Sequence, residues 1–147
     1  MNTQRPALPS DLLPFWYHRP MQRASRIAVG LIALLHIYIL VLEMFLWETE
    51  RGLKAFNMTA EFAAKTAVLA ANQGLYNGFL AAGLIFGLLY KDRRVGQHLQ
   101  LFFVSCIAVA GIYGAASVKL SILFIQTVPA VIAGTLVLLS MRKSAAG

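Results

Sequence analysis

Residues 27–47 read IAVGLIALLHIYILVLEMFLW, and Glu43 is the one charged side chain among them. At about 1.5 Å of rise per residue, a helix of this length crosses a hydrocarbon core of about 30 Å. Three further stretches, residues 67–90, 99–118 and 120–141, contain no charged residue. Because every backbone polar group in lipid must be bonded within its own segment, we predict four membrane-spanning helices.

The composition of the chain argues against a soluble domain of the same size. Of its 147 residues, 59% are hydrophobic and only 13% are charged. A small soluble domain has a large surface to cover with polar groups, so it cannot be this apolar. We therefore expect an all-α protein whose four-transmembrane-helix bundle covers residues 27–141. An amino-terminal interfacial segment, residues 1–26, would precede the bundle, and a cytoplasmic tail, residues 142–147, would follow it.

The net charge of +7 indicates orientation in a bilayer rather than nucleic-acid binding. Nine cations flank the predicted spans on the side of the two termini: Arg5, Arg19, Arg23, Arg26, Lys91, Arg93, Arg94, Arg142 and Lys143. Four flank the other side: Arg51, Lys54, Lys65 and Lys119. By the positive-inside rule both termini lie in the cytoplasm. We expect a multi-pass protein of a bacterial inner membrane, with the lipid bilayer as its main partner.

Two segments beside the spans carry local signals. Residues 14–18, PFWYH, place three aromatic rings together. Such rings favour the headgroup zone, so we expect residues 11–22 to lie along the cytoplasmic interface. In the long outer connection, Thr59 followed by Glu61 is typical of a helix N-terminus, which predicts that the second helix begins near Ala60.

Polar side chains within the predicted spans are costly and are candidates for a functional site. In the first span, His36 and Glu43 are seven residues apart and share one face, and Trp47 lies on that face too. Counting residues from the middle of each span places four further polar side chains at the same outer depth as Glu43: Asn72, Gln73, Tyr113 and Gln126. Tyr76 and Asn77 lie nearer the midplane, closer to His36. These nine residues predict a polar pocket built around Glu43.

Each of these residues also has a purely structural interpretation. Asn72 and Gln126 suit hydrogen bonds that join helices, typically worth about 1 kcal/mol. Trp47 suits an interface belt, and His36 alone is more often a bonded core histidine than a ligand. Glu43 is harder to explain structurally, since a carboxylate at that depth must be protonated or paired with a donor. The predicted spans contain no Lys or Arg to pair with it.

Small residues and one proline predict how the helices pack. Gly74, Gly78 and Ala82, and then Gly83 and Gly87, line the second span, while Cys106, Ala110, Gly111, Gly114 and Ala115 line the third. Such spacing lets helices approach closely, and it would also suit a homo-oligomer. Pro129 should kink the fourth helix and free a carbonyl near Gln126. Cys106, the one cysteine, offers no disulfide and no metal-ligand spacing.

Three segments together carry a resemblance to a known family: residues 36–47 (HIYILVLEMFLW), 71–81 (ANQGLYNGFLA) and 110–115 (AGIYGA). Across roughly residues 25–140 the chain resembles the small four-span bacterial membrane proteins of domain of unknown function 1304. The resemblance implies a four-helix inner-membrane protein of no established activity. Its recurring motif residues match His36, Glu43, Trp47, Asn72, Gln73, Tyr76, Asn77 and Tyr113. Residues 1–24 look like an addition to the usual length of the family.

The sequence favours a pocket for a small lipophilic molecule reached from the bilayer. Glu43 and His36 are a candidate catalytic acid–base pair, because a carboxylate and an imidazole in a water-poor site can exchange protons. The candidate ligand-binding residues are Trp47, Asn72, Gln73, Tyr76, Asn77, Tyr113 and Gln126. Neither the substrate nor a cofactor follows from the sequence.

Three alternatives remain open at the level of sequence. A small proton-coupled exporter of the multidrug type also carries one membrane-embedded glutamate. The charge bias disfavours the inverted dimer of such exporters, and Glu43 lies off the midplane. Haem ligation by His36 at a subunit interface is a second alternative, since His18 and His98 lie far from it along the spans. The third is an accessory subunit of a membrane complex, in which the amides serve only as links between helices.

Overall fold

The computed structural model describes residues 18–144, and it describes side chains from residue 20 to residue 141. This part of the chain is helical and contains no strand. The elements in chain order are α1 (His18–Phe45), α2 (Glu50–Phe56), α3 (Ala60–Leu89), α4 (Arg93–Ser117), η3 (Leu123–Thr127) and α5 (Val128–Ser144). Most of the predicted interfacial segment, residues 1–17, and the last three residues of the predicted tail lie outside the described residues.

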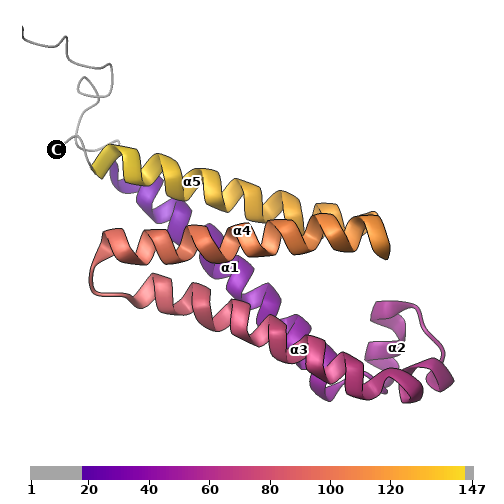
Figure 1. Ribbon diagram of the computed structural model, residues 1–147. Helices are drawn as coiled ribbons and strands as arrows, with labels where there is room; N and C mark the ends of the chain where they lie inside the picture. The colour runs from indigo at the N-terminus through magenta and orange to yellow at the C-terminus, as the bar shows by residue number, and fades with distance from the viewer. Residues whose placement is uncertain (1–17, 145–147) are drawn as a thin grey trace, which may run out of the picture.

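The four long helices run antiparallel to their neighbours (Figure 1). α1 contacts α3 and α5, and α4 contacts the same two helices. The first turn of α1 and the last turn of α5 therefore lie at one end of the molecule, which we call the inner end. The short helix α2 lies at the opposite, outer end, where the α1–α3 pair diverges from the α4–α5 pair (Figure 1).

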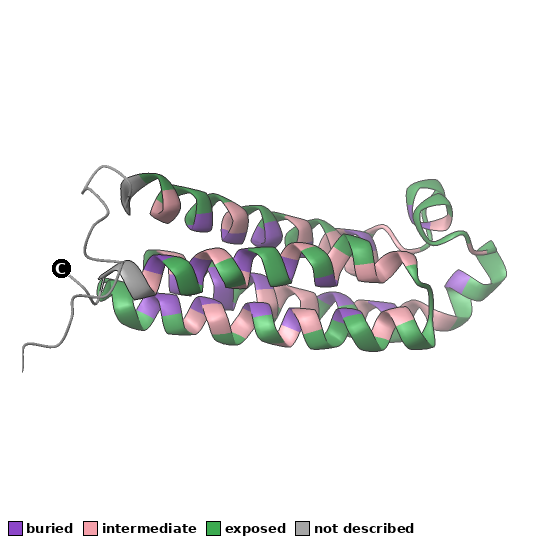
Figure 2. Ribbon diagram, turned by 90° about the horizontal axis from the view of Figure 1, so that it is seen from above, coloured by how far each residue is buried: buried purple, intermediate pink, exposed green. Residues whose placement is uncertain are grey.

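The core is a narrow apolar column between the four long helices. Its buried members are Val29, Ile32, Ala33, Leu84, Val104, Ile107, Ala130, Ala133 and Val137. Buried residues follow the inward face of each helix, while the outward faces are exposed (Figure 2). Those outward faces are themselves apolar; Val68, for example, is 83% exposed and Leu89 is 75% exposed. Such a surface suits lipid rather than water.

Three helices are long and apolar enough to cross a membrane: Pro20–Phe45, Arg93–Ser117 and Leu123–Met141. These correspond to the first, third and fourth predicted spans. α3, which contains the predicted second span, is not among them, although it has 30 residues. Its middle carries Asn72, Gln73 and Asn77, whose amides lower the average hydropathy of the helix. The described chain is thus an all-α protein with three candidate membrane spans.

Local signals account for several helix ends. The Thr59 side chain accepts a hydrogen bond from the backbone N–H of Phe62, and α3 begins at Ala60, so the predicted N-cap is confirmed. α2 was not predicted from the sequence, although its N-cap Thr49 accepts from Gly52 in the same way. It ends at Asn57, whose left-handed backbone (φ 50°) is one that asparagine tolerates. Residues 18–26 were expected in the interfacial segment, and in the structure they form the first turns of α1.

Pro129 disturbs the last helix as expected, but the form of the disturbance differs. Instead of a simple kink, the turn before the proline widens into the π-helical segment η3. There the backbone N–H of Val128 bonds to the carbonyl of Leu123, five residues earlier. Proline has no N–H and its ring clashes with the carbonyl four residues earlier, so a wider turn relieves both problems.

Candidate functional site

Glu43 and Asn77 form a hydrogen-bonded pair between α1 and α3. The Asn77 side-chain nitrogen donates to Oε2 of Glu43 at 2.9 Å and to the backbone carbonyl of Gln73 at 3.1 Å. The two side chains can bond because α1 and α3 approach each other closely at Gly74. A Cβ on Gly74 would lie 2.6 Å from the Met44 side chain, so only glycine fits there. The carboxylate thus has the donor that its place in an apolar helix requires.

His36 is fully buried, and one of its ring nitrogens has no partner. Nδ1 lies 2.9 Å from the backbone carbonyl of Ile32. A carbonyl oxygen can only accept, so the ring hydrogen of the neutral imidazole lies on Nδ1. Nε2 is then an acceptor, and among the described side chains it is the one buried nitrogen or oxygen that no protein group bonds. Such orphaned groups are rare in native proteins.

The expected acid–base pair is not a contact pair. Seven residues separate His36 from Glu43, which corresponds to about 10 Å of rise along α1. Glu43 accepts from Asn77, and Nε2 of His36 accepts from no described group. Leu40 lies between the two on the same face of α1, and its backbone carbonyl would lie 3.1 Å from a Cβ on Gly74. Proton exchange between the two groups would therefore need a molecule that reaches both.

Trp47 ties the outer end of α1 to its neighbours. Its ring nitrogen donates to the backbone carbonyl of Ala63 at 3.1 Å and to the Thr66 hydroxyl at 3.2 Å. Its ring also packs on Phe56 of α2, with 4.8 Å between centroids. The residue thus joins α1, α2 and α3 one turn beyond Glu43.

None of the other predicted residues makes a described hydrogen bond to Glu43. The Gln126 side chain donates to the backbone carbonyl of Ile107 at 3.1 Å, so it joins η3 to α4. Asn72 and Gln73 are exposed on α3. Tyr76 is 52% exposed and Tyr113 is 74% exposed. Of the nine side chains, only those of Glu43 and Asn77 bond to each other, because equal depth along a helix says nothing about which way a side chain points.

The sequence reasoning missed a polar cluster at the inner end. The Gln97 side chain donates to the Ser140 hydroxyl at 2.7 Å, and that of Gln100 donates to the backbone carbonyl of Gly87 at 2.9 Å. The Arg26 guanidinium donates to the backbone carbonyl of Leu88 at 3.0 Å. Gln97 and Gln100 are three residues apart at the start of a span and therefore share a helix face, and this spacing could have indicated the cluster from the sequence.

The described residues contain no cluster of three or more His, Cys, Asp or Glu side chains that could hold a metal ion. Cys106 is a free thiol of intermediate burial in α4. His36 is the one described residue whose ring resembles that of a metal or haem ligand. In such ligands one ring nitrogen is held by a hydrogen bond, as Nδ1 is here by the Ile32 carbonyl, and the other nitrogen is left for the metal.

Comparison with known proteins assigns the family. The model of the family described as "Protein of unknown function (DUF1304)" matches residues 30–138. The chain belongs to the DUF1304 family. The matched region contains all nine predicted site residues, from His36 to Gln126. It excludes Arg26 and the rest of the first turns of α1.

Among curated proteins, the chain is similar to the uncharacterized protein YpaA of Lactococcus lactis subsp. lactis (strain IL1403). The two are 32% identical over 98 residues, which cover 65% of this chain and 81% of the relative. No solved structure matches the chain. Membership in DUF1304 thus identifies the family of the chain, and the description of that family names no activity.

Proposed function

We propose that this DUF1304 protein crosses the membrane four times and binds a small lipophilic molecule between α1 and α3, with His36 and Glu43 as its polar contacts. The observation that carries the proposal is the orphaned Nε2 of His36, in a residue with 0% exposure. Leaving a buried acceptor unbonded costs about 1–3 kcal/mol. A ligand hydroxyl or N–H that donates to Nε2 would remove that cost.

The proposed fourth span is α3. Its 30 residues correspond to about 45 Å, more than the roughly 30 Å of a hydrocarbon core. It packs between α1 and α4, both of which are candidate spans. Many of its outward side chains are apolar; Phe79 and Phe86, for example, are each 57% exposed. In this arrangement the inner end faces the cytoplasm, in agreement with the cation bias of the sequence.

The chemistry of the two ends of the site defines the class of ligand. Nε2 of His36 accepts a hydrogen, and the Glu43 carboxylate accepts hydrogens or pairs with a cation. The face of α1 between them carries apolar Leu40. The fitting molecule is therefore mainly apolar, reaches over about 10 Å, and carries a hydroxyl or amine. Such a molecule would also link the two groups for acid–base conversion.

The test is native mass spectrometry of the protein purified in a mild detergent, with three variants. His36→Leu removes the orphaned acceptor at similar size, Glu43→Gln removes the charge while keeping an acceptor for Asn77, and Val68→Ala is a control on the exposed side of α3. We expect a co-purified molecule on the parent and on Val68→Ala, and at least tenfold less of it on both site variants. Equal retention by all four proteins would overturn the proposal.

A second candidate, an accessory subunit without a ligand, is favoured by the amides. Asn77, Gln97, Gln100 and Gln126 all donate to groups on another helix. Bonds of this kind fix helix register. This candidate predicts no bound molecule and a His36→Leu protein at least as stable as the parent. The multidrug-type transporter is less favoured, since Glu43 lies two residues before the end of α1 rather than near the midplane.

A further inference from the structure

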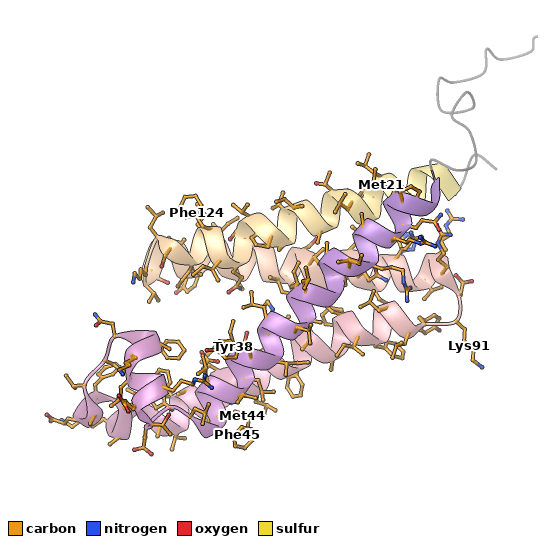
Figure 3. All side chains as sticks on the ribbon, turned by 180° about the vertical axis from the view of Figure 1, so that it is seen from behind. Met21, Tyr38, Met44, Phe45, Lys91 and Phe124 are labelled. Atoms are coloured by element: carbon orange, nitrogen blue, oxygen red, sulfur yellow. The ribbon has the colours of Figure 1, made fainter. Side chains whose placement is uncertain are left out.

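A cavity of about 240 Å³ opens at the inner end of the molecule, among the ends of α1, α3 and α4. It is separate from the proposed site, which lies in the outer half of α1. Side-chain nitrogens gather at this end (Figure 3). The residues at its mouth are Arg26 of α1, Tyr90 and Lys91 of the α3–α4 connection, and Arg93 of α4.

The mouth is strongly positive. Arg26, Lys91 and Arg93 line the cavity, and no Asp or Glu lines it. Among the described side chains, ion pairs occur only at the outer end, between Lys54 and Glu50 and between Lys65 and Glu61. The nearby Asp92 instead caps α4, accepting from the backbone N–H of Val95 at 3.0 Å. Arg26 and Arg93 at the mouth, and Lys91, whose side chain points away from the helices (Figure 3), are therefore not paired with a described carboxylate.

The inner wall of the cavity is polar and held in place. Ser25, Gln97 and Gln100 are buried there, at 3%, 7% and 4% exposure. Each glutamine nitrogen uses one N–H in the bonds described above and has a second N–H, because a side-chain amide carries two donors. The guanidinium of Arg26 likewise keeps donors beyond the one on Leu88. The lining thus offers amide and guanidinium donors to the space.

We propose that this cavity binds a phosphate group, and that the phosphate belongs to an anionic phospholipid of the cytoplasmic leaflet. Arginine recognises phosphate through paired, charge-assisted hydrogen bonds. The volume is below the roughly 300 Å³ at which drug-sized ligand pockets begin, so it suits one compact headgroup. Basic pockets at the cytoplasmic ends of spanning helices are placed where such headgroups lie.

The test is native mass spectrometry of the full chain in detergent, titrated separately with phosphatidylglycerol and with phosphatidylcholine. The double variant Arg26→Gln with Arg93→Gln removes two cations from the mouth. The matched control is Arg94→Gln, which changes a neighbouring exposed cation that does not line the cavity. At roughly fivefold per cation, we expect about 25-fold weaker phosphatidylglycerol binding by the double variant and no change in the control.

Each outcome decides the proposal. Preference of the parent for phosphatidylglycerol over phosphatidylcholine, lost in the double variant alone, supports the lipid site. Competition by millimolar inorganic phosphate at the same residues would assign the phosphate to a soluble ligand instead. Equal binding of both lipids, or equal loss in the double variant and in Arg94→Gln, would overturn the site. A thermal shift checks the folding of the variants: phosphatidylglycerol should raise the Tm of the parent and of Arg94→Gln, and the single variant Arg93→Gln should show a reduced shift.

Discussion

Glu43 shows how one charged side chain is accommodated in an apolar helix. An isolated carboxylate in such surroundings is costly, and its cost falls when a neighbour donates a hydrogen bond. Asn77 supplies that bond from α3 and is itself oriented by the carbonyl of Gln73. His36 contrasts with Glu43, since its Nε2 has no such donor. Glu43 is thus matched by a donor within the chain, whereas Nε2 of His36 is buried without a described partner.

Substituting Asn77 by Ala should destabilise the protein by about 1 kcal/mol, because the Glu43 carboxylate loses its donor. The free energy of unfolding can be measured by titrating the purified protein in mild detergent with sodium dodecyl sulfate. Asn72→Ala serves as the control, since Asn72 is exposed on the same helix and makes no described hydrogen bond. Equal effects of the two substitutions would contradict a specific role for the Glu43–Asn77 bond.

Close contact between α3 and α4 depends on a pair of glycines near their connection. A Cβ on Gly96 would lie 2.5 Å from the backbone carbonyl of Gly87 and 3.3 Å from Cβ of Tyr90. A helix backbone carbonyl cannot move aside as a flexible side chain can. Gly111 plays the same part between α4 and η3. A Cβ on it would clash with the hydroxyl of Thr127 and would lie 3.0 Å from the Thr127 backbone nitrogen. The small-residue pattern predicted close approach, and the structure assigns each glycine its partner.

Gly96→Ala should lower the free energy of unfolding by about 1–3 kcal/mol, since the two helices must separate to admit a methyl group. Gly30→Ala is the matched control, because a Cβ there meets nothing within 4 Å. This control should be neutral or stabilising by up to about 1 kcal/mol, since alanine restricts the unfolded chain more than glycine does. The same detergent unfolding assay compares both. Gly96→Ala as stable as Gly30→Ala would mean that the α3–α4 contact is looser than described.

The whole molecule has two chemically different ends. The inner end carries the basic cavity, and the outer end carries two exposed Lys–Glu pairs, one on α2 and one at the start of α3. Exposed pairs of this kind add little to stability, typically 0.3–0.5 kcal/mol each on a helix. The apolar outward faces between the two ends form a lateral surface suited to lipid. This division supports the orientation in a bilayer that is proposed above.

If α3 crosses the membrane, α2 and the α3–α4 connection lie on opposite sides. We expect Ala55→Cys, in a Cys106→Ala background, to react with a membrane-impermeant maleimide in intact cells. Lys91→Cys in the same background should react only after the membrane is permeabilised. Cys106→Ala alone, which has no thiol, gives the baseline. Labelling of both positions in intact cells would show that α3 does not cross.

The sequence by itself determined the helical class, three apolar helices of spanning length, the N-terminus of α3 at Thr59 and the position of the disturbance at Pro129. These follow from local properties: hydropathy over a window, a side chain that caps its own helix, and a missing backbone donor. Only the tertiary structure decided which polar residues meet. Asn72, Gln73, Tyr113 and Gln126 were expected at the depth of Glu43. The side chain that bonds Glu43 is instead Asn77, which was expected nearer His36, while Gln126 bonds to Ile107 and Tyr113 is 74% exposed. The direction of a side chain depends on the rotation of each helix about its axis, and packing at glycines such as Gly74 and Gly111 sets that rotation.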